Sequence, residues 1–495
     1  MTTPPTGWAD TLADLARRRA AARAMGGPAR LAAHHATGKL DARARVEALL
    51  DPGSFREFGT LVGGPETPAD GIVAGSGCID GNPVMVGAED FTTAAGTIGA
   101  GSNAKRDRLA ELALRNRIPL VMLLEGAGFR PGRHGRSRTD LITQARCSGL
   151  VPTVAAVLGP SAGHGALVAP ICDFRIMTEA GAIFTAGPPV VRESTGEQVS
   201  KQDLGGPAVA LASGVIHNLG ADDAAVLADI RRYLSYFPSS AWCYPPDRPG
   251  TGARPTPELL DIVPRDNRRG YDIRRVLDVV LDAPDWFEVA PTFGAAMVCA
   301  LGHLGGHPVA VVANQPGVRA GAIDTDAADK AAHFITVADS FHLPIVFLAD
   351  NPGMLCGSAS ERAGVLRAGA RMYAAQTTAS TLKLHLTLRK AYGFGSMVMA
   401  LLGFDGQAGT FGWPGATMGA MSAAALTAAA KADAAAAAAL AAAELQASFG
   451  SAENLGFDEL IDPRETRDAL LDALNRGLGA RQSPAGPVAR TVITP

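Results

Sequence analysis

The sequence predicts an α/β protein made of two tandem copies of one domain. The prediction rests first on two stretches, RIPLVMLLEGAGF (117–129) and HLPIVFLADNPGM (342–354), which share a proline, an apolar run, one acidic residue and a glycine-containing turn. Counted back from these prolines, each copy has a lysine fourteen residues earlier and another proline twenty-two residues before the lysine. Spacing held over such a distance indicates an internal duplication. The matched pairs are Pro83 and Pro308, Lys105 and Lys330, Pro119 and Pro344, and Glu125 and Asp350.

Each copy predicts the same order of elements. The earlier proline opens a short apolar run, PVMVGAED or PVAVVANQ, that is typical of a strand, and a glycine-bearing loop follows it. Apolar residues at helical spacing then mark KRDRLAELALRNR and KAAHFITVADSF. A further pair of equal length, VPTVAAVLGPSAGHG (151–165) and TLKLHLTLRKAYGFG (381–395), adds an alternating strand with a Gly-x-Gly ending. Strands alternating with helices favour an α/β layer structure in each half.

Domain boundaries follow from the repeat and from composition. The segment SAWCYPPDRPGTGARPTPE (240–258) is rich in proline and glycine and is typical of a linker. We therefore expect an N-terminal domain at 1–250 and a C-terminal domain at 251–495. The alanine-rich run 422–447 predicts one long helix, because alanine has the highest helix propensity.

Composition excludes several classes of protein. A net charge of −3 and sparse aromatic residues argue against a nucleic-acid or acidic-membrane partner. The six cysteines lie far apart and none forms a CxxC pair, which favours a reducing cytoplasm over a disulfide framework or a zinc ribbon. The first residues lack the apolar region of a signal peptide, and no apolar run reaches the length of a membrane span. We expect a cytoplasmic protein.

Two matching glycine turns are the first candidate site. In GPSAGHG and KAYGFG a buried strand runs into a turn that opens a helix-like stretch. Glycine lets the backbone approach a ligand, and the free N–H groups of a helix start favour negative charge. The turns therefore predict two oxyanion sites, although such glycines also serve tight strand–helix packing.

Two side chains near the first turn suggest other chemistry. Residues 159–163 match the GxSxG nucleophile elbow of α/β-hydrolases, with Ser161 as the nucleophile, but the repeat places Ala391 there. His164 lies in the turn itself, where its backbone N–H is of more interest than its ring. The other histidines show no metal-ligand spacing.

The ordered motifs resemble the carboxyltransferase (β) subunits of biotin-dependent acyl-CoA carboxylases, such as those for propionyl-CoA and methylcrotonyl-CoA. The resemblance covers nearly the whole chain and its most specific part is ANQP with the following DKAA-F. The matching stretches are HHATGKLDARARVEALLDPGSFREF, DGIVAGSGCIDGNPV, DLGGPAVALASGVIH, VVANQPGVRAGAIDTDAADKAAHFI, DNPGM, RKAYGFGSMVM, WPGATMGAM and IDPRETRDALLDAL.

The resemblance implies a duplicated crotonase-type fold with acyl-CoA bound by the N-terminal half and biotin by the C-terminal half. It also implies a hexamer, a trimer of dimers, with active sites between halves of different subunits. No Met-Lys-Met biotinylation motif is present, so the biotin and the biotin carboxylase activity would belong to a partner (α) subunit. The family's reaction takes the carboxyl group from N-carboxybiotin and lets biotin accept the α-proton of the thioester. Negative charge then develops on two oxygens, and two sets of donors are needed.

Carried over residue by residue, the resemblance gives the two turns their roles. The N–H groups of Gly163 and His164 would hold the thioester oxygen, and those of Gly393 and Phe394 would hold the biotin ureido oxygen. Further substrate and cofactor contacts are implied at Gly126, Ala127, Gly128, Arg130, Ala162, Gly165, Tyr392, Gly395 and Met397.

Departures from the family pattern affect both turns and the acyl pocket. The usual Ala-Gly-Gly ends in His164 here, and the usual Gly-Gly of the second copy ends in Phe394. Met397 stands where short-chain members carry an aspartate, which implies a more apolar or differently shaped acyl group, or plain packing. The basic run Arg130, Arg133, Arg136 and Arg138 either contacts CoA phosphates or forms a solvated loop.

Three alternatives stay open at this point. The same oxyanion sites would serve an acyl-CoA decarboxylase or a transcarboxylase, because both run the same steps in a different direction. A hydrolase that uses Ser161 is a second alternative. An inactive paralogue that only assembles with other β subunits is a third.

Overall fold

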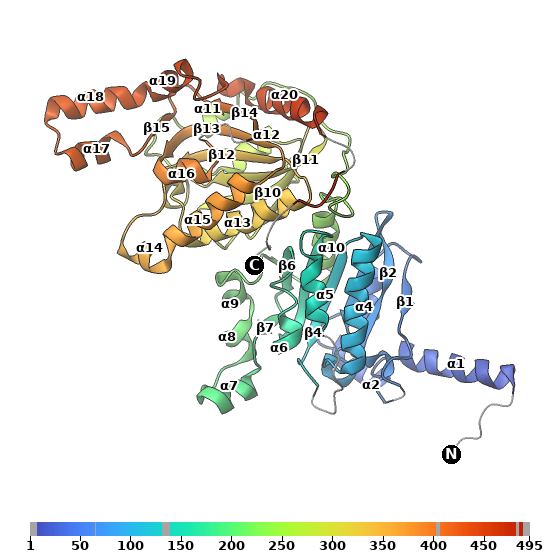
Figure 1. Ribbon diagram of the computed structural model, residues 1–495. Helices are drawn as coiled ribbons and strands as arrows, with labels where there is room; N and C mark the ends of the chain where they lie inside the picture. Colours follow the sequence, from blue (N-terminus) through green and yellow to red (C-terminus); the bar gives the residue numbers. More distant parts are fainter. Residues whose placement is uncertain (1–6, 65, 131–138, 402–405, 482–484, 489–495) are drawn as a thin grey trace. The chain divides into compact units, whose positions relative to one another are not determined.

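The chain folds as two compact units, residues 1–234 and residues 235–493, in a computed structural model (Figure 1). The structure describes residues 7–64, 66–130, 139–401, 406–481 and 485–488. Each unit is a mixed sheet covered by helices, so the α/β class predicted from the sequence is confirmed. Among the described residues, no helix combines the length and the apolar character that crossing a membrane requires.

The sheet of the first unit has the strand order β1-β2-β3-β4-β5-β6-β8, and β7 pairs with β5. β1, β2 and β3 are antiparallel, and every later pairing from β3 onward is parallel. The central β4 is buried at all its positions, as expected of a parallel strand covered on both faces. The strands are β1 (Arg56–Phe58), β2 (Ile72–Ile79), β3 (Asn82–Glu89), β4 (Leu120–Gly126), β5 (Thr153–Ala162), β6 (Phe174–Thr178), β7 (Ala182–Phe184) and β8 (Asn218–Gly220).

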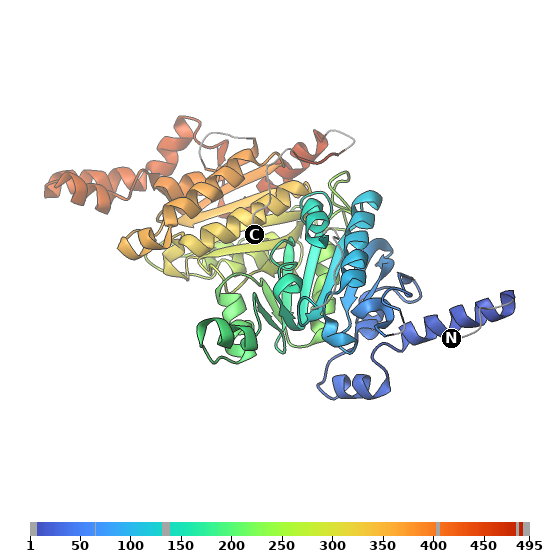
Figure 2. The same cartoon turned by 60° about the horizontal axis from the view of Figure 1, so that its bottom comes forward.

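Helices α4 and α5 lie side by side in the first unit, and α4 packs on β2, β3 and β4 (Figure 1). α3 also packs on β2 and β3, and α10 packs on β5 and β6. Helix α1 projects away from the sheet in both views (Figure 2). The helices are α1 (Trp8–Arg23), α2 (Pro28–His35), α3 (Ala42–Leu49), α4 (Ala100–Asn116), α5 (Asp140–Cys147), α6 (Gly163–Ala166), α7 (Pro188–Thr195), α8 (Lys201–Gly205), α9 (Pro207–Ala212) and α10 (Asp223–Leu234), with short 3₁₀ turns η1 (Pro68–Gly71) and η2 (Ala94–Gly96).

The second unit repeats this sheet with the order β16-β14-β13-β12-β11-β10-β9, and β15 pairs with β13. Its core runs through β10 to β14 and onto α11, α12 and α20. The strands are β9 (Phe287–Val289), β10 (Met297–Leu304), β11 (His307–Asn314), β12 (Ile345–Asn351), β13 (Lys383–Tyr392), β14 (Gln407–Gly412), β15 (Thr417–Gly419) and β16 (Glu459–Leu460). The helices are α11 (Leu259–Ile262), α12 (Arg274–Val280), α13 (Thr325–Ser340), α14 (Ser358–Ala363), α15 (Val365–Thr378), α16 (Gly393–Val398), α17 (Ala423–Ala430), α18 (Ala434–Leu445), α19 (Ala447–Glu453) and α20 (Thr466–Gly479), with 3₁₀ turns η3 (Arg319–Gly321) and η4 (Pro463–Glu465).

The duplication read from the spacing is confirmed by the register of the two sheets. Ile72 pairs with Glu89 in the first unit, and Met297 pairs with Asn314 at the matching place in the second. The other matching pairs are Leu120–Thr153 with Ile345–Lys383, Gly126–Ser161 with Asn351–Ala391, and Ala162–Phe184 with Tyr392–Gly419. Residues of the paired strands in the two units can therefore be compared one to one.

The alanine-rich run differs from the prediction of one long helix. It forms two helices, α17 and α18, because Lys431 takes a left-handed φ of 50° and ends the first of them. The Asp433 side chain then accepts a hydrogen bond from the N–H of Ala436 and caps the second. α18 has no buried residue, and both helices project from the second unit (Figure 1).

Candidate active site

Both predicted turns lie at the carboxyl end of a central strand. β5 ends at Ala162 and α6 begins at Gly163, while β13 ends at Tyr392 and α16 begins at Gly393. Gly163 and Gly393 have φ of 55° and 52°, a left-handed conformation that favours glycine. The first N–H groups of a helix have no acceptor within that helix. Each turn therefore presents backbone donors beside a strand end.

A second glycine loop approaches each turn. In the first unit a Cβ on Gly128 would lie 3.1 Å from the Ala162 carbonyl oxygen, so this loop and the turn are in contact. In the second unit a Cβ on Gly353 would lie 3.4 Å from the carbonyl oxygen of Tyr392. The structure thus brings together the predicted residues that follow β4 and β5. Among the described residues, no acceptor is found for the N–H of Gly128.

The remaining predicted residues take several positions. The guanidinium of Arg130 binds the carboxylate of Asp70 and donates from Nε to Thr97 Oγ1 at 2.9 Å, so protein groups already engage it. The other three arginines of the basic run lie outside the described residues. Met397 is half-buried in α16, and the Tyr392 hydroxyl donates to the Glu444 carboxylate at 2.6 Å. A Cβ on Gly395 would lie 2.7 Å from the Cα of Gly353, whereas one on Gly165 would lie 3.3 Å from a carboxylate oxygen of Glu89.

A buried network of charges lies beneath the first turn, and sequence reasoning missed it. The Nε2 atom of His164 lies 2.5 Å from Oδ1 of Asp140, the first residue of α5. Arg106 on α4 donates from Nε to Asp140 at 2.7 Å and from a terminal nitrogen to Glu89 at 2.6 Å. Glu89 in turn accepts the backbone N–H of Glu125 at 2.8 Å. The network therefore links the turn after β5 to the end of β4.

Burial and partners set the charge states in this network. Burial disfavours the carboxylate of Asp140, but the hydrogen bond from His164 and the charge of Arg106 outweigh it and lower its pKa to about 2. Burial raises the pKa of Glu89, against the attraction of Arg106. Asp140 is thus a firmly ionised acceptor for the histidine ring.

Asp140 should make the stability of the protein sensitive to acid. Its pKa is depressed on folding, so its contribution is present above the unfolded value of about 3.9 and is lost as the pH falls towards 2. We expect the wild-type protein to lose about 2 kcal/mol more than an Asp140→Asn variant across this window. Urea unfolding at a series of acid pH values measures the difference. If the free energy of unfolding changes with pH by the same amount in the two proteins, the expectation is wrong.

The second unit carries different residues at the same positions. Asn314 replaces Glu89 in the strand register, and its Oδ1 accepts the N–H of Asp350 at 3.1 Å. Ala331 follows Lys330 as Arg106 follows Lys105, and Ala370 on α15 precedes β13 by as many residues as Asp140 precedes β5. Phe394 replaces His164, and its ring centroid lies 6.0 Å from that of Tyr373 on α15. The charged network is thus confined to the first unit.

The acid before each loop is buried and paired in both units. Glu125 is fully buried and binds Arg45 at 2.6 Å, with Lys39 on its other oxygen. Asp350 is fully buried and binds Arg389 at 2.7 Å, while the Tyr271 hydroxyl donates to it at 3.0 Å. These pairs hold the strand ends from which the loops start.

A cavity of about 450 Å³ adjoins the loop after β4, which contains Ala127 and Gly128. Its lining includes the basic residues Arg30 and Lys39 and the aromatic rings of His34 and Phe91. It also includes Ala95, whose carbonyl oxygen accepts the N–H of Ala127 at 3.0 Å. The complete lining is Arg30, Ala33, His34, Thr37, Lys39, Phe91, Thr92, Ala94 and Ala95.

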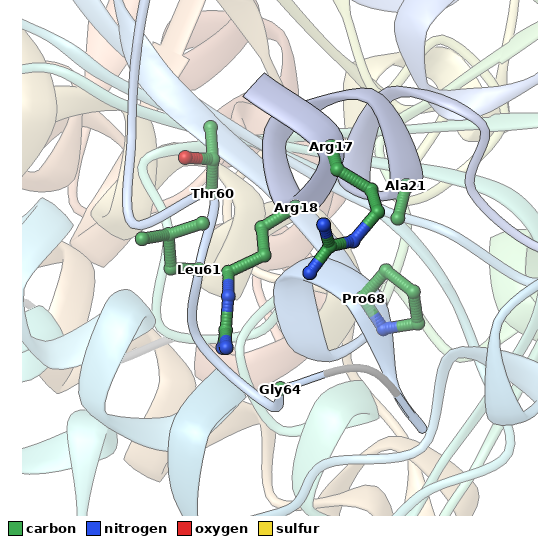
Figure 3. A pocket seen from close by; sticks show the side chains of 7 residues that line it. All are labelled: Arg17, Arg18, Ala21, Thr60, Leu61, Gly64 and Pro68. Atoms are coloured by element: carbon green, nitrogen blue, oxygen red, sulfur yellow. The ribbon is translucent and has the colours of Figure 1, made fainter. Parts of the chain in front are cut away.

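A second pocket, of about 270 Å³, lies beside α1 (Figure 3). Arg17 and Arg18 reach into it from α1, while Leu61 lines it from the loop after β1 and Pro68 from η1. Both arginines pair with Asp14. None of its lining residues belongs to the predicted site.

The geometry around Ser161 does not support a nucleophilic serine. Its side chain is fully buried, and its hydroxyl has no hydrogen-bond partner in the part of the chain that the structure describes. A nucleophilic serine needs a general base within hydrogen-bond reach. The histidine three residues later is instead bound to Asp140.

Comparisons with known proteins agree with the fold and with the motifs. The family profile of the carboxyl transferase domain matches residues 33–481. The chain is 35% identical to the methylmalonyl-CoA carboxyltransferase 12S subunit of Propionibacterium freudenreichii subsp. shermanii, covering 95% of this chain and 94% of that protein. It is also 35% identical to the propionyl-CoA carboxylase carboxyltransferase subunit of Haloferax mediterranei, covering 96% and 97% of the two chains.

A solved structure matches over the full length. The crystal structure of transcarboxylase 12S, a hexamer with methylmalonyl-coenzyme A and methylmalonic acid bound, superposes with a TM-score of 0.91 at 32% identity, covering 99% of this chain and 100% of that one. The two repeated sheets are therefore duplicated crotonase-like halves. The chain belongs to the carboxyl transferase domain family, and within it to the carboxyltransferase subunits of biotin-dependent acyl-CoA carboxylases.

Proposed function

We propose that this protein transfers a carboxyl group from N-carboxybiotin, carried on a partner protein, to the α-carbon or vinylogous carbon of an acyl-CoA. The observation that supports this most is the duplicated turn. The first N–H groups of α6 and of α16 lie at the same place in two matching sheets, after β5 and after β13. A reaction that places negative charge on two separate oxygens needs two such donor sets.

The first unit serves the acyl-CoA. The N–H groups of Gly163 and His164 hold the thioester oxygen, with Gly128 of the neighbouring loop contributing a further N–H. The adjoining cavity carries Arg30, whose guanidinium suits a phosphate of an elongated anionic substrate, while Lys39 in the same lining pairs with Glu125. The half-buried Met397 belongs to the other unit and borders the acyl group only if the halves of different subunits combine.

The second unit serves biotin, which supplies the carboxyl group when it is bound. The residues of this unit fit a planar ureido group. Gly393 has no side chain that would keep a planar group away from the turn. The N–H groups of Gly393 and Phe394 hold the ureido oxygen. Asn351 accepts the N–H of Gly353 at 3.0 Å and so fixes the loop beside the turn. The partner that carries biotin is a biotin carboxylase and carrier (α) subunit. We expect copies of this chain to form a homo-hexamer, a trimer of dimers, to which that partner binds.

The direction of the reaction is the main alternative. The donors that stabilise an enolate during carboxylation stabilise the same enolate during decarboxylation, so a transcarboxylase or an acyl-CoA decarboxylase fits the same site. The similarity to a methylmalonyl-CoA carboxyltransferase supports this second candidate. Acyl-CoA-dependent turnover by the purified complex would exclude an inactive paralogue.

The function is tested by carboxylation of a panel of acyl-CoAs of short, branched and long chain. The assay contains labelled bicarbonate, ATP and a biotinylated α subunit from the same genome. We expect label in one class of acyl-CoA, and an apolar preference would agree with Met397. If the partner becomes carboxylated and no acyl-CoA is labelled, the carboxylase function is wrong. Release of CO₂ from methylmalonyl-CoA in the same mixture would then support the decarboxylase.

A further inference from the structure

We propose that His164 is a side-chain base at the acyl site, and that with Asp140 it gives the protein a biotin-independent activity, the exchange of the α-protons of acyl-CoA. This inference rests on the proposed function, because it requires the thioester at the first turn. The family's reaction needs no such base, since biotin accepts the proton.

The orientation of the ring leaves one nitrogen available. His164 Nε2 is held 2.5 Å from Asp140 Oδ1, and a carboxylate only accepts hydrogen bonds, so Nε2 carries the hydrogen. In the neutral ring Nδ1 is then the acceptor. Within the described residues Nδ1 has no hydrogen-bond partner, and the side chain is 19% exposed. The partly exposed ring thus keeps one nitrogen without a partner among the described residues.

The position of His164 places that nitrogen near the reacting atoms. A short covalent path joins Nδ1 to the backbone nitrogen of the same residue, which is one of the donors assigned to the thioester oxygen. The α-carbon of an acyl-CoA is bonded to the carbonyl carbon that bears this oxygen. A substrate held by the backbone thus brings its α-proton within reach of the ring.

The groups behind the ring favour this role. Asp140 is fully buried and ionised, and it stabilises the imidazolium that forms when His164 takes a proton. Arg106 binds the other oxygen of Asp140 and keeps the carboxylate in place. The arrangement matches that of general bases in enzymes, in which a third group orients the base.

The fold itself does not require this network. The second unit has the same sheet and the same turn, yet it holds Phe394, Ala370, Ala331 and Asn314 at the four matching positions. A set of buried charges that appears in one copy only has a role specific to that copy. The acyl side is the copy whose substrate has a proton to lose.

The proposed step is balanced without any further reactant. The bond from the α-carbon to hydrogen breaks, the proton moves to Nδ1, and the electron pair forms an enolate whose oxygen is held by the backbone donors. Solvent exchanges the proton on the ring, and the reverse transfer returns a proton or a deuteron to the α-carbon.

The test is deuterium incorporation in D₂O by the full-length protein without biotin, ATP or partner. The probes are propionyl-CoA, butyryl-CoA and octanoyl-CoA, and mass spectrometry follows the exchange. We expect His164→Phe, which copies the second unit and keeps the backbone N–H, to lower the exchange rate about 100-fold to 10,000-fold. Asp140→Asn should lower it as well, because the amide donates a hydrogen bond and reverses the tautomer. Binding of each acyl-CoA is measured by calorimetry on the same samples.

A matched control removes another histidine–aspartate pair. His307 at the start of β11, in the second unit, binds Asp247 at 2.8 Å, and neither residue belongs to the assigned site, so His307→Phe should exchange at the wild-type rate. If the wild-type protein binds and carboxylates acyl-CoA but does not exchange faster than His164→Phe, the inference is wrong and the proposed function stands. If the wild-type protein binds no acyl-CoA, both are wrong.

Discussion

The Arg106→Ala variant is expected to unfold with a free energy about 3–5 kcal/mol below that of the wild-type protein. Arg106 is 1% exposed and is the cation that binds both Asp140 and Glu89. Without it, two buried carboxylates repel each other, and burial already raises the pKa of Glu89 with the arginine present. Urea unfolding followed by circular dichroism, at equal protein concentrations, measures the loss.

The second unit supplies the matched control for this prediction. A triple variant, Glu89→Asn, Arg106→Ala and Asp140→Ala, installs the residues that the second unit carries at the matching positions and removes the charges together. Replacing a buried ion network with uncharged groups is often close to neutral. We therefore expect the triple variant to recover most of the stability lost by the single one, while losing α-proton exchange. Equal instability of both variants would show that packing around Arg106, and not unpaired charge, is the cause.

The repeat was readable in the sequence because it depends on local residues. A proline before an apolar run and an acid before a glycine turn each reflect a strand end that the chain must build from adjacent residues. The equal spacing of these residues in the two copies predicted the duplication, and the pairing of Gly126 with Ser161 and of Asn351 with Ala391 confirms it. The positions of Gly163 and Gly393 followed for the same reason.

The charged network was not readable in this way. Glu89, Arg106 and Asp140 come from β3, α4 and α5, and no spacing along the chain relates them to His164. They meet only when these elements pack. A comparison of the two copies would have given a signal, because the second copy has Asn314 at the position of the acidic Glu89.

Local capping also explains the error in the alanine run. Alanine propensity predicts helix throughout, but propensity does not decide where a helix stops. Lys431 takes the left-handed conformation and Asp433 caps the next helix. The sequence KADAAAA contains that capping aspartate, which was the available signal.

Replacing Phe394 by proline is expected to lower the kcat of carboxyl transfer about 100-fold to 1,000-fold. Residue 394 is the second residue of α16, where an N–H has no acceptor within the helix and proline is tolerated. The substitution removes the N–H that we assign to the ureido oxygen. It also removes the ring that packs near Tyr373.

Phe394→Ala separates these two losses, because alanine lacks the ring and keeps the N–H. We expect Phe394→Ala to retain most of the activity, and the ratio between the two variants to report the backbone donor alone. Transfer of the carboxyl group from the carboxylated partner to acyl-CoA is measured at saturating acyl-CoA, with thermal unfolding to show that both variants are folded. Acyl-CoA affinity should stay at its wild-type value in both, because the first turn is intact. Equal activities of the proline and alanine variants would mean that the N–H of residue 394 is not used, and the second turn would then need another role.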